Sequence, residues 1–89
     1  MSEDFFMLYD EKEQTQTRYI GFMGKTSRHD LVIIETERFY GKRLIINIQT
    51  NKAAIIGQDD LQEDGYLEHA FGVTKEEAED LLDFLQSVV

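Results

Sequence analysis

The fold of this chain is decided by residues 43–56, RLIINIQTNKAAII. Apolar side chains recur at every second position in its first half, at Leu44, Ile46 and Ile48, which is the period of a β-strand. A second apolar run follows almost at once. Asn51 lies between the two runs, and Asn tolerates the left-handed backbone conformation of a tight turn. Because a short link makes neighbouring strands antiparallel, the stretch predicts a hairpin.

Three earlier runs also have the composition of strands. They cover residues 5–9, 18–23 and 31–36. Gly41 can adopt the positive φ of a tight reversal, and it would join the third run to the hairpin. The chain therefore predicts an antiparallel meander of four or five strands.

The period changes to that of a helix after residue 74. Thr74 and Glu77 form a capping box, in which each side chain satisfies a free backbone N–H of the other residue. The apolar positions then fall on one helical face: Ala78, Leu81, Leu82, Leu85 and Val88. A weaker pattern at 59–68 indicates a shorter helix with Asp59 as its N-cap and Gly65 as its stop.

These patterns predict one α+β domain over residues 1–89, with a strand-rich part at 1–58 and an acidic helical part at 59–89. The meander would pack against the C-terminal amphipathic helix. Several strands are apolar on both faces, so the second face needs a cover. The candidates are barrel-like closure of the sheet, the 59–72 segment or a second subunit. We expect closure or the segment ahead of a subunit, because small domains often close their own sheets.

All of the net charge of −9 lies in the helical part. Residues 59–89 hold ten acidic residues and one base, Lys75, whereas residues 1–58 hold eight of each sign. Such segregation indicates either a surface for a basic partner or simple solubility. The acidic balance argues against binding to nucleic acid or to anionic membranes.

The candidate interaction residues share a negative charge and a predicted place on or near the helical part. They are Asp60, Glu63, Asp64, Glu76, Glu79, Asp80 and Asp83. We expect them to form an acidic ridge that docks a Lys/Arg-rich protein surface, with binding that weakens as salt rises.

Catalytic and metal-binding patterns are incomplete. The polar set most able to converge in the fold is Ser27, Arg28, His29 and Asp30 with His69. Ser27, His29 and Asp30 have the residue types of a catalytic triad, but a triad is defined by geometry rather than by adjacency in the sequence. Residues 24–27 end like a phosphate-binding loop, yet the upstream glycine and the following helix are missing. The acidic residues at 59–65 lack the order of an EF-hand. We predict no catalytic residue, no metal and no cofactor.

The compartment predicted from the sequence is the cytoplasm. The chain has no cysteine, and its start is acidic where a signal peptide would be basic. No apolar run approaches the length of a membrane span.

Several stretches together resemble a known family. They are 5–10 (FFMLYD), 17–24 (TRYIGFMG), 39–42 (FYGK), 59–61 (DDL) and 65–68 (GYLE). They resemble a family of small cytosolic proteins of unknown function from Bacillus- and Staphylococcus-type Gram-positive bacteria. The resemblance implies a cytosolic bacterial α+β protein and carries no activity, cofactor or catalytic residue with it.

Three functional hypotheses follow. The favoured one is a non-enzymatic protein-interaction module that uses the acidic helical face. The second is a small enzyme or ligand binder that uses the Ser27–Asp30 loop with His69. The third is a structural homodimer buried through the second face of the sheet, which an apolar patch left open on the monomer would favour.

Overall fold

The computed structural model describes residues 4–89, and within them the chain forms one four-stranded antiparallel sheet. The strands are β1 (Gln16–Met23), β2 (Arg28–Glu35), β3 (Arg43–Asn47) and β4 (Lys52–Ile56). They lie in the order β1-β2-β3-β4, so every strand pairs with its neighbour in the sequence. The predicted meander is therefore confirmed. Ser2 and Glu3, part of the acidic start, lie outside the described residues.

Three helices follow the sheet: α1 (Gln58–Leu61), α2 (Tyr66–Phe71) and α3 (Lys75–Leu85). The weakly predicted helix at 59–68 is in fact two short ones, because Gly65 adopts a left-handed backbone with φ of 78° between them. Gly57, not Asp59, is the N-cap of α1. The Asp60 carboxylate accepts from the Gly57 N–H at 2.8 Å, which supplies the cap from inside the helix.

Local signals place the turns and the start of α3. Asn51 has φ of 60° and Gly41 has φ of 72°, as the turns between strands require. The capping box is formed in both directions: the Glu77 N–H donates to Thr74 Oγ1 at 3.1 Å, and the Thr74 N–H donates to Glu77 Oε1 at 2.9 Å. These features were predicted and are confirmed.

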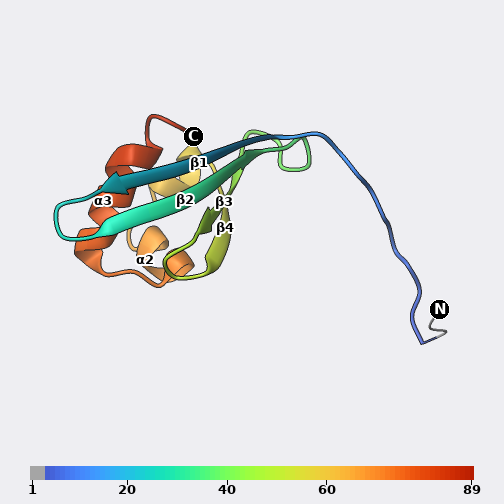
Figure 1. Cartoon of the computed structure of the whole chain (residues 1–89), viewed down its shortest axis with the longest axis horizontal. Helices are drawn as coiled ribbons and strands as arrows, with labels where there is room; N and C mark the ends of the chain where they lie inside the picture. Colours follow the sequence, from blue (N-terminus) through green and yellow to red (C-terminus); the bar gives the residue numbers. More distant parts are fainter. Residues whose placement is uncertain (1–3) are drawn as a thin grey trace.

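The core lies between one face of the sheet and all three helices (Figure 1). The sheet and the helices both contribute to it with fully buried side chains. They are Leu31, Ile33, Ile45, Ile56, Phe71, Leu81 and Leu85, with Leu61, Leu67 and Ala78 nearly as buried. The predicted apolar face of the last helix is thus the core face, although Leu82 is only partly buried. Val88, also partly buried, lies beyond the end of α3 at Leu85 and not on its face as predicted.

Neither favoured cover for the second face of the sheet is present. The sheet is open, since β1 and β4 are its two edges and do not pair. The 59–72 segment packs through Leu61, Leu67 and Phe71 into the same core as α3. The buried apolar residues of all three helices therefore pack on one side of the sheet, and within residues 4–89 no helix or strand covers its other face.

Residues 4–15 form an extended arm that leaves the globular body (Figure 1). The first predicted strand, 5–9, lies in this arm and is not a strand, because its backbone pairs with no neighbour in the described part of the chain. The arm accounts for the elongated dimensions of the molecule, 50 × 25 × 24 Å. Because residues 5–9 are not a strand, the described part of the chain has four strands and not five.

Candidate functional site

The β1–β2 turn and helix α3 are joined by a buried polar pair. His29 begins the inner side of β2 and is 3% exposed, and Asp80 on α3 is 8% exposed. His29 Nε2 lies 3.1 Å from Asp80 Oδ2. The backbone N–H of Lys25 also donates to both carboxylate oxygens of Asp80, at 3.2 Å each. The hydrogen bond to His29, with that from Lys25, holds the pKa of Asp80 below its ordinary value.

The side of α3 that carries Asp80 makes two further contacts with the β1–β2 hairpin. Ser27 Oγ donates to Glu77 Oε2 at 3.0 Å, and the ring of Phe84 lies 5.0 Å from that of Phe22. Residues 77, 80 and 84 share one side of a helix because they are spaced by three and four positions. We call this contact the α3 latch: Ser27–Glu77, His29–Asp80 and Phe22–Phe84.

Gly24 allows Asp80 to approach the turn. A Cβ on Gly24 would lie 1.8 Å from Asp80 Oδ2, far inside van der Waals contact. The Gly24 N–H donates to the Ser27 carbonyl at 2.7 Å, which closes the turn. The loop that ends like a phosphate-binding motif therefore holds an anion of its own chain, the Asp80 carboxylate.

This geometry does not assemble a nucleophile with its base. Ser27 donates to Glu77, and no hydrogen bond links Ser27 with His29 among the described residues. Asp30 points to the other face of the sheet, where it pairs with Arg28 at 2.9 Å. His69 is exposed on α2, and no hydrogen bond or ion pair joins it to residues 27–30 within residues 4–89. The loop set predicted from the sequence is therefore divided between separate environments.

The predicted acidic ridge is also divided. Asp80 is buried in the α3 latch, so its side chain does not lie on the exposed face of α3 where the sequence pattern placed it. The Asp60 carboxylate accepts from Gly57 and from Lys42 Nζ at 3.0 Å; the Gly57 N–H, then the Lys42 ammonium, lowers its pKa. The other five remain exposed: Glu63, Asp64, Glu76, Glu79 and Asp83.

Three of those five line a hollow of about 330 Å³ between the α1–α2 loop, α2 and α3. We call it the acidic hollow. Its floor is apolar, formed by Leu61, Leu67, Ala78 and Leu82 with Tyr66. Its rim carries four acids, Glu63, Asp64, Glu68 and Glu79, against one base, Lys75. Glu76 and Asp83 are not among its lining residues.

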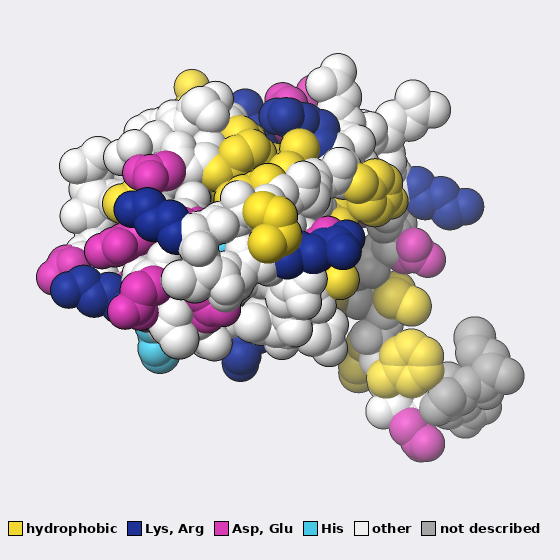
Figure 2. All heavy atoms as spheres, turned by 60° about the vertical axis from the view of Figure 1, so that its left-hand side comes forward, with side chains coloured by type: hydrophobic (Ala, Val, Ile, Leu, Met, Phe, Trp, Pro, Cys, Tyr) yellow, Lys and Arg dark blue, Asp and Glu magenta, His cyan; other side chains and the backbone are white. Residues whose placement is uncertain are grey.

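The second surface is the sheet face that no helix covers, which we call the open face. Two apolar rows cross it in register: Tyr19, Val32, Ile46 and Ala53, and then Thr17, Ile34, Leu44 and Ile55. Tyr19 is 79% exposed, and Ile55 is also exposed. Figure 2 shows hydrophobic side chains gathered on the globular body and others along the arm. The sequence pattern of apolar residues on both faces is confirmed by this arrangement.

Comparison with known proteins supplies one match. A family model described as SAV0927-like matches residues 8–87. The chain belongs to the SAV0927-like family. That description names no activity, cofactor or partner. No curated protein matches the chain.

For this SAV0927-like protein, the described residues contain no group of three or more His, Asp or Glu side chains arranged to hold a metal ion. None of its described helices is both long and apolar enough to cross a membrane. Its candidate sites are the two surfaces that the lining residues and the strand register define, the acidic hollow and the open face.

Sequence reasoning on this family member missed the hollow because the floor and the rim come from three elements. Glu63 and Glu79 are sixteen positions apart, and no local pattern joins them. Asp80 was missed as a latch residue because helical spacing alone assigns it to the acidic side. Its partner His29 is 51 positions away.

Proposed function

We propose that this protein is a non-enzymatic interaction module that binds a basic, amphipathic segment of another protein in the acidic hollow. The observation that supports the proposal is the combination of an apolar floor with a rim of four acids and one base. A solvated acidic surface needs no apolar floor. Lys and Arg suit such a site because their aliphatic stems cover apolar surface while their charged ends reach carboxylates.

The energetics of such a site can be divided between floor and rim. Leu61 and Leu67 are already nearly buried, so the partly buried Leu82 and Tyr66 would supply affinity when a partner removes their remaining apolar area from water. The rim would supply orientation, exclusion of acidic competitors and a faster encounter. Because the rim charges are exposed, their contribution falls as salt screens them, while that of the floor does not.

The compartment and the wider family range form part of the proposal. We infer that the protein acts in the cytoplasm, and that its relatives occur in Bacillus- and Staphylococcus-type bacteria as the sequence resemblance implies. A cytosolic setting gives an acidic hollow access to the basic surfaces of nucleic-acid-binding proteins, which are partners of suitable charge.

The test uses a synthetic amphipathic helix with lysines on one side and leucines on the other, titrated into the full chain. We expect saturable binding that weakens from low to high salt. The double variant Glu63→Gln with Glu79→Gln should weaken binding about tenfold or more, as for the loss of two charged contacts.

The matched control is Glu76→Gln with Asp83→Asn, which removes the same charge from exposed positions of α3 outside the hollow. It should leave the affinity within about a factor of two, because distant surface charges are largely screened. Equal loss in both double variants would mean that net charge alone attracts the peptide, and the hollow would then have no specific role.

A further inference from the structure

The arm carries an apolar segment that its own chain does not bury. Residues 5–9, FFMLY, are all exposed, and Phe6 and Leu8 are each 93% exposed. Large apolar side chains exposed together mark interaction sites rather than ordinary surface. The same chain therefore has an uncovered apolar arm and an uncovered apolar sheet face.

The base of the arm is fixed beside the turn that follows β2. Thr36 Oγ1 donates to Glu13 at 2.6 Å, and Arg38 pairs with Glu11. The Arg38 guanidinium also lies over the Tyr9 ring, 5.2 Å from its centroid. These contacts hold residues 9–13 at the end of the sheet, where Gln16 pairs with Glu35.

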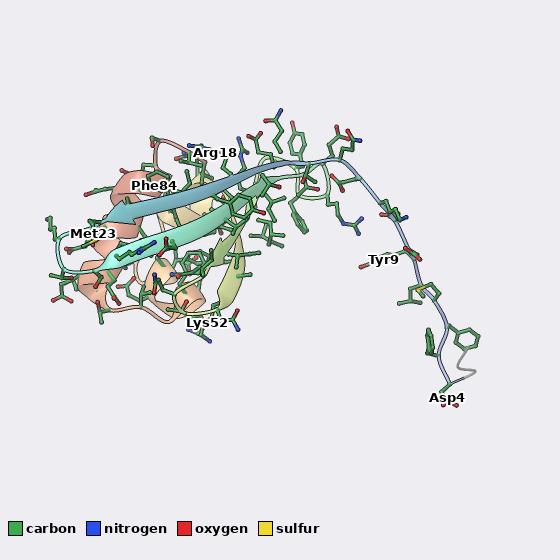
Figure 3. The ribbon with its side chains drawn as sticks, viewed as in Figure 1. Asp4, Tyr9, Arg18, Met23, Lys52 and Phe84 are labelled. Atoms are coloured by element: carbon green, nitrogen blue, oxygen red, sulfur yellow. The ribbon has the colours of Figure 1, made fainter. Side chains whose placement is uncertain are left out.

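From that position the arm runs away from its own open face. In Figure 3, Tyr9 and Asp4 lie progressively farther from the body, on the side opposite Met23. Folding back onto the open face would require the chain to reverse and to break the contacts of Glu11 and Glu13. The arm therefore points away from the open face of its own chain.

The dimensions of arm and face agree. Five extended residues span about 17 Å, and four strands span about 15 Å across the sheet. The two apolar rows of the open face run across all four strands. An extended segment of five residues, such as 5–9, has the length to lie across all four strands of these rows.

The distribution of charge along the chain also favours a second copy of this chain as the molecule that covers the open face. Residues 1–58, which contain both the arm and the sheet, sum to zero, whereas residues 59–89 carry the whole charge of −9. The helical layer lies on the opposite side of the sheet from the open face. Two copies that meet through their open faces would thus hold their acidic layers outward and apart.

We propose that two copies of this chain exchange arms, so that residues 5–9 of each copy lie across the open face of the other. The contact is reciprocal, as in a two-fold symmetric dimer. Three aromatic residues per arm, each able to bury about 150–250 Å², bring two arms and two faces to the roughly 1,200–2,000 Å² of a stable interface. This contact is separate from the acidic hollow and does not depend on the proposed function.

The test exploits the lack of cysteine in the chain. Leu8→Cys is mixed, in separate experiments, with Tyr19→Cys and with Ala53→Cys, which lie on β1 and β4 at the two sides of the open face. A thiol–disulfide buffer then lets disulfides exchange, so that bonds between cysteines that lie close together accumulate. The matched control partner is Glu76→Cys, which is exposed on α3. We expect a mixed disulfide with one or both open-face partners and none above background with Glu76→Cys.

The second measurement is the concentration-dependent mass of the full chain by sedimentation equilibrium. The unmodified chain should approach twice its monomer mass, and raising salt should not dissociate it. Phe6→Ser with Leu8→Ser should weaken self-association by roughly tenfold or more, as expected for two lost apolar contacts. Its melting temperature as a monomer should be unchanged, because these side chains are exposed in one copy.

Three results would overturn the proposal. One is a monomer at every concentration. Another is a dimer that persists undiminished in the arm variant, which would mean direct contact of two sheets. The third is a disulfide within one chain of a Leu8→Cys, Ala53→Cys double variant at high dilution, which would mean that each arm covers its own sheet. None of these results bears on peptide binding in the acidic hollow, so the two proposals fail separately.

Discussion

Asp80 Oδ2 lies 3.1 Å from His29 Nε2, and this buried contact joins the last helix to the start of β2 across 51 positions of sequence. The carboxylate also accepts from the Lys25 N–H in the β1–β2 turn. Asp80, which the sequence pattern assigns to an acidic surface, is therefore a buried side chain that joins α3 to the β1–β2 hairpin. The charge available to partners is correspondingly smaller and lies elsewhere, chiefly around the acidic hollow.

Loss of the latch carboxylate should destabilise the fold. Asp80→Ala leaves His29 buried without this partner and the Lys25 N–H without its acceptor, and unsatisfied buried polar groups are costly. We expect a clear fall in melting temperature. Asp83→Ala, an exposed acid on the same helix, is the control and should change stability by no more than about 0.5 kcal/mol. Equal melting temperatures for the two variants would rule out a structural role for the latch.

A methyl group at Gly24 should have a similar effect. Gly24→Ala places Cβ where Asp80 Oδ2 and Cγ now lie, so either the helix or the turn must shift. Overpacking of this kind costs about 1–3 kcal/mol. Gly21→Ala, an exposed position on β1, meets only the end of the Asp30 side chain at 3.0 Å, and chemical denaturation should show a smaller loss. A greater loss at Gly21 than at Gly24 would contradict this packing.

Stability should fall in acid, and Asp80 should contribute to the fall. Hydrogen bonding from His29 lowers the pKa of Asp80, and the Thr74 N–H, with the Ser27 hydroxyl, lowers that of Glu77. A depressed pKa in the folded state contributes stability that is present above the unfolded pKa, about 3.9 for Asp and 4.3 for Glu. That contribution is lost as the pH falls through the folded value.

The measurement is urea unfolding from neutral pH down to about pH 3. Asp80→Asn should give a shallower loss of stability with falling pH than the unmodified chain, because one depressed carboxylate is missing. Parallel curves for the two proteins would show that the folded state does not favour the ionised form of Asp80.

The core face of α3 gives a prediction of known magnitude. Leu85 is fully buried, so Leu85→Ala should cost about 2–5 kcal/mol. Leu82 is only partly buried, at the floor of the acidic hollow, so Leu82→Ala should cost less in folding and more in peptide affinity. Thermal melts and peptide titrations measure the two effects separately. An unchanged melting temperature for Leu85→Ala would contradict the packing of α3 on the sheet.

Features set by neighbouring residues could be predicted from the sequence. Thr74 and Glu77 are three positions apart, and Asn51 and Gly41 determine their turns through their own backbone preferences. The alternation that begins at residue 43 likewise marks β3, although the strand ends at Asn47 and residues 48–50, predicted to continue it, form the turn. Each of these signals is a local cause with a local effect.

Features that depend on residues distant in the sequence could not be predicted from it. The apolar composition of 5–9 is that of a strand, but a strand also needs a partner, and the contacts of Glu11 and Glu13 direct this segment away from the sheet. The open face results from three helices packing on the same side, which no periodicity indicates. The acidic hollow needs Glu63, in the α1–α2 loop, and Glu79, on α3, to line the same surface depression.

If the acidic hollow, and not the charge of the helical part as a whole, receives a basic partner, the peptide must contact the residues that line it. This is best measured by an NMR titration of the isotopically labelled full chain with the peptide that bears lysines on one side and leucines on the other. We expect amide shifts to concentrate at residues 61–68 and 75–82, with little change along β2 and β3. Shifts spread evenly over the exposed acids, or concentrated on the open face, would contradict it.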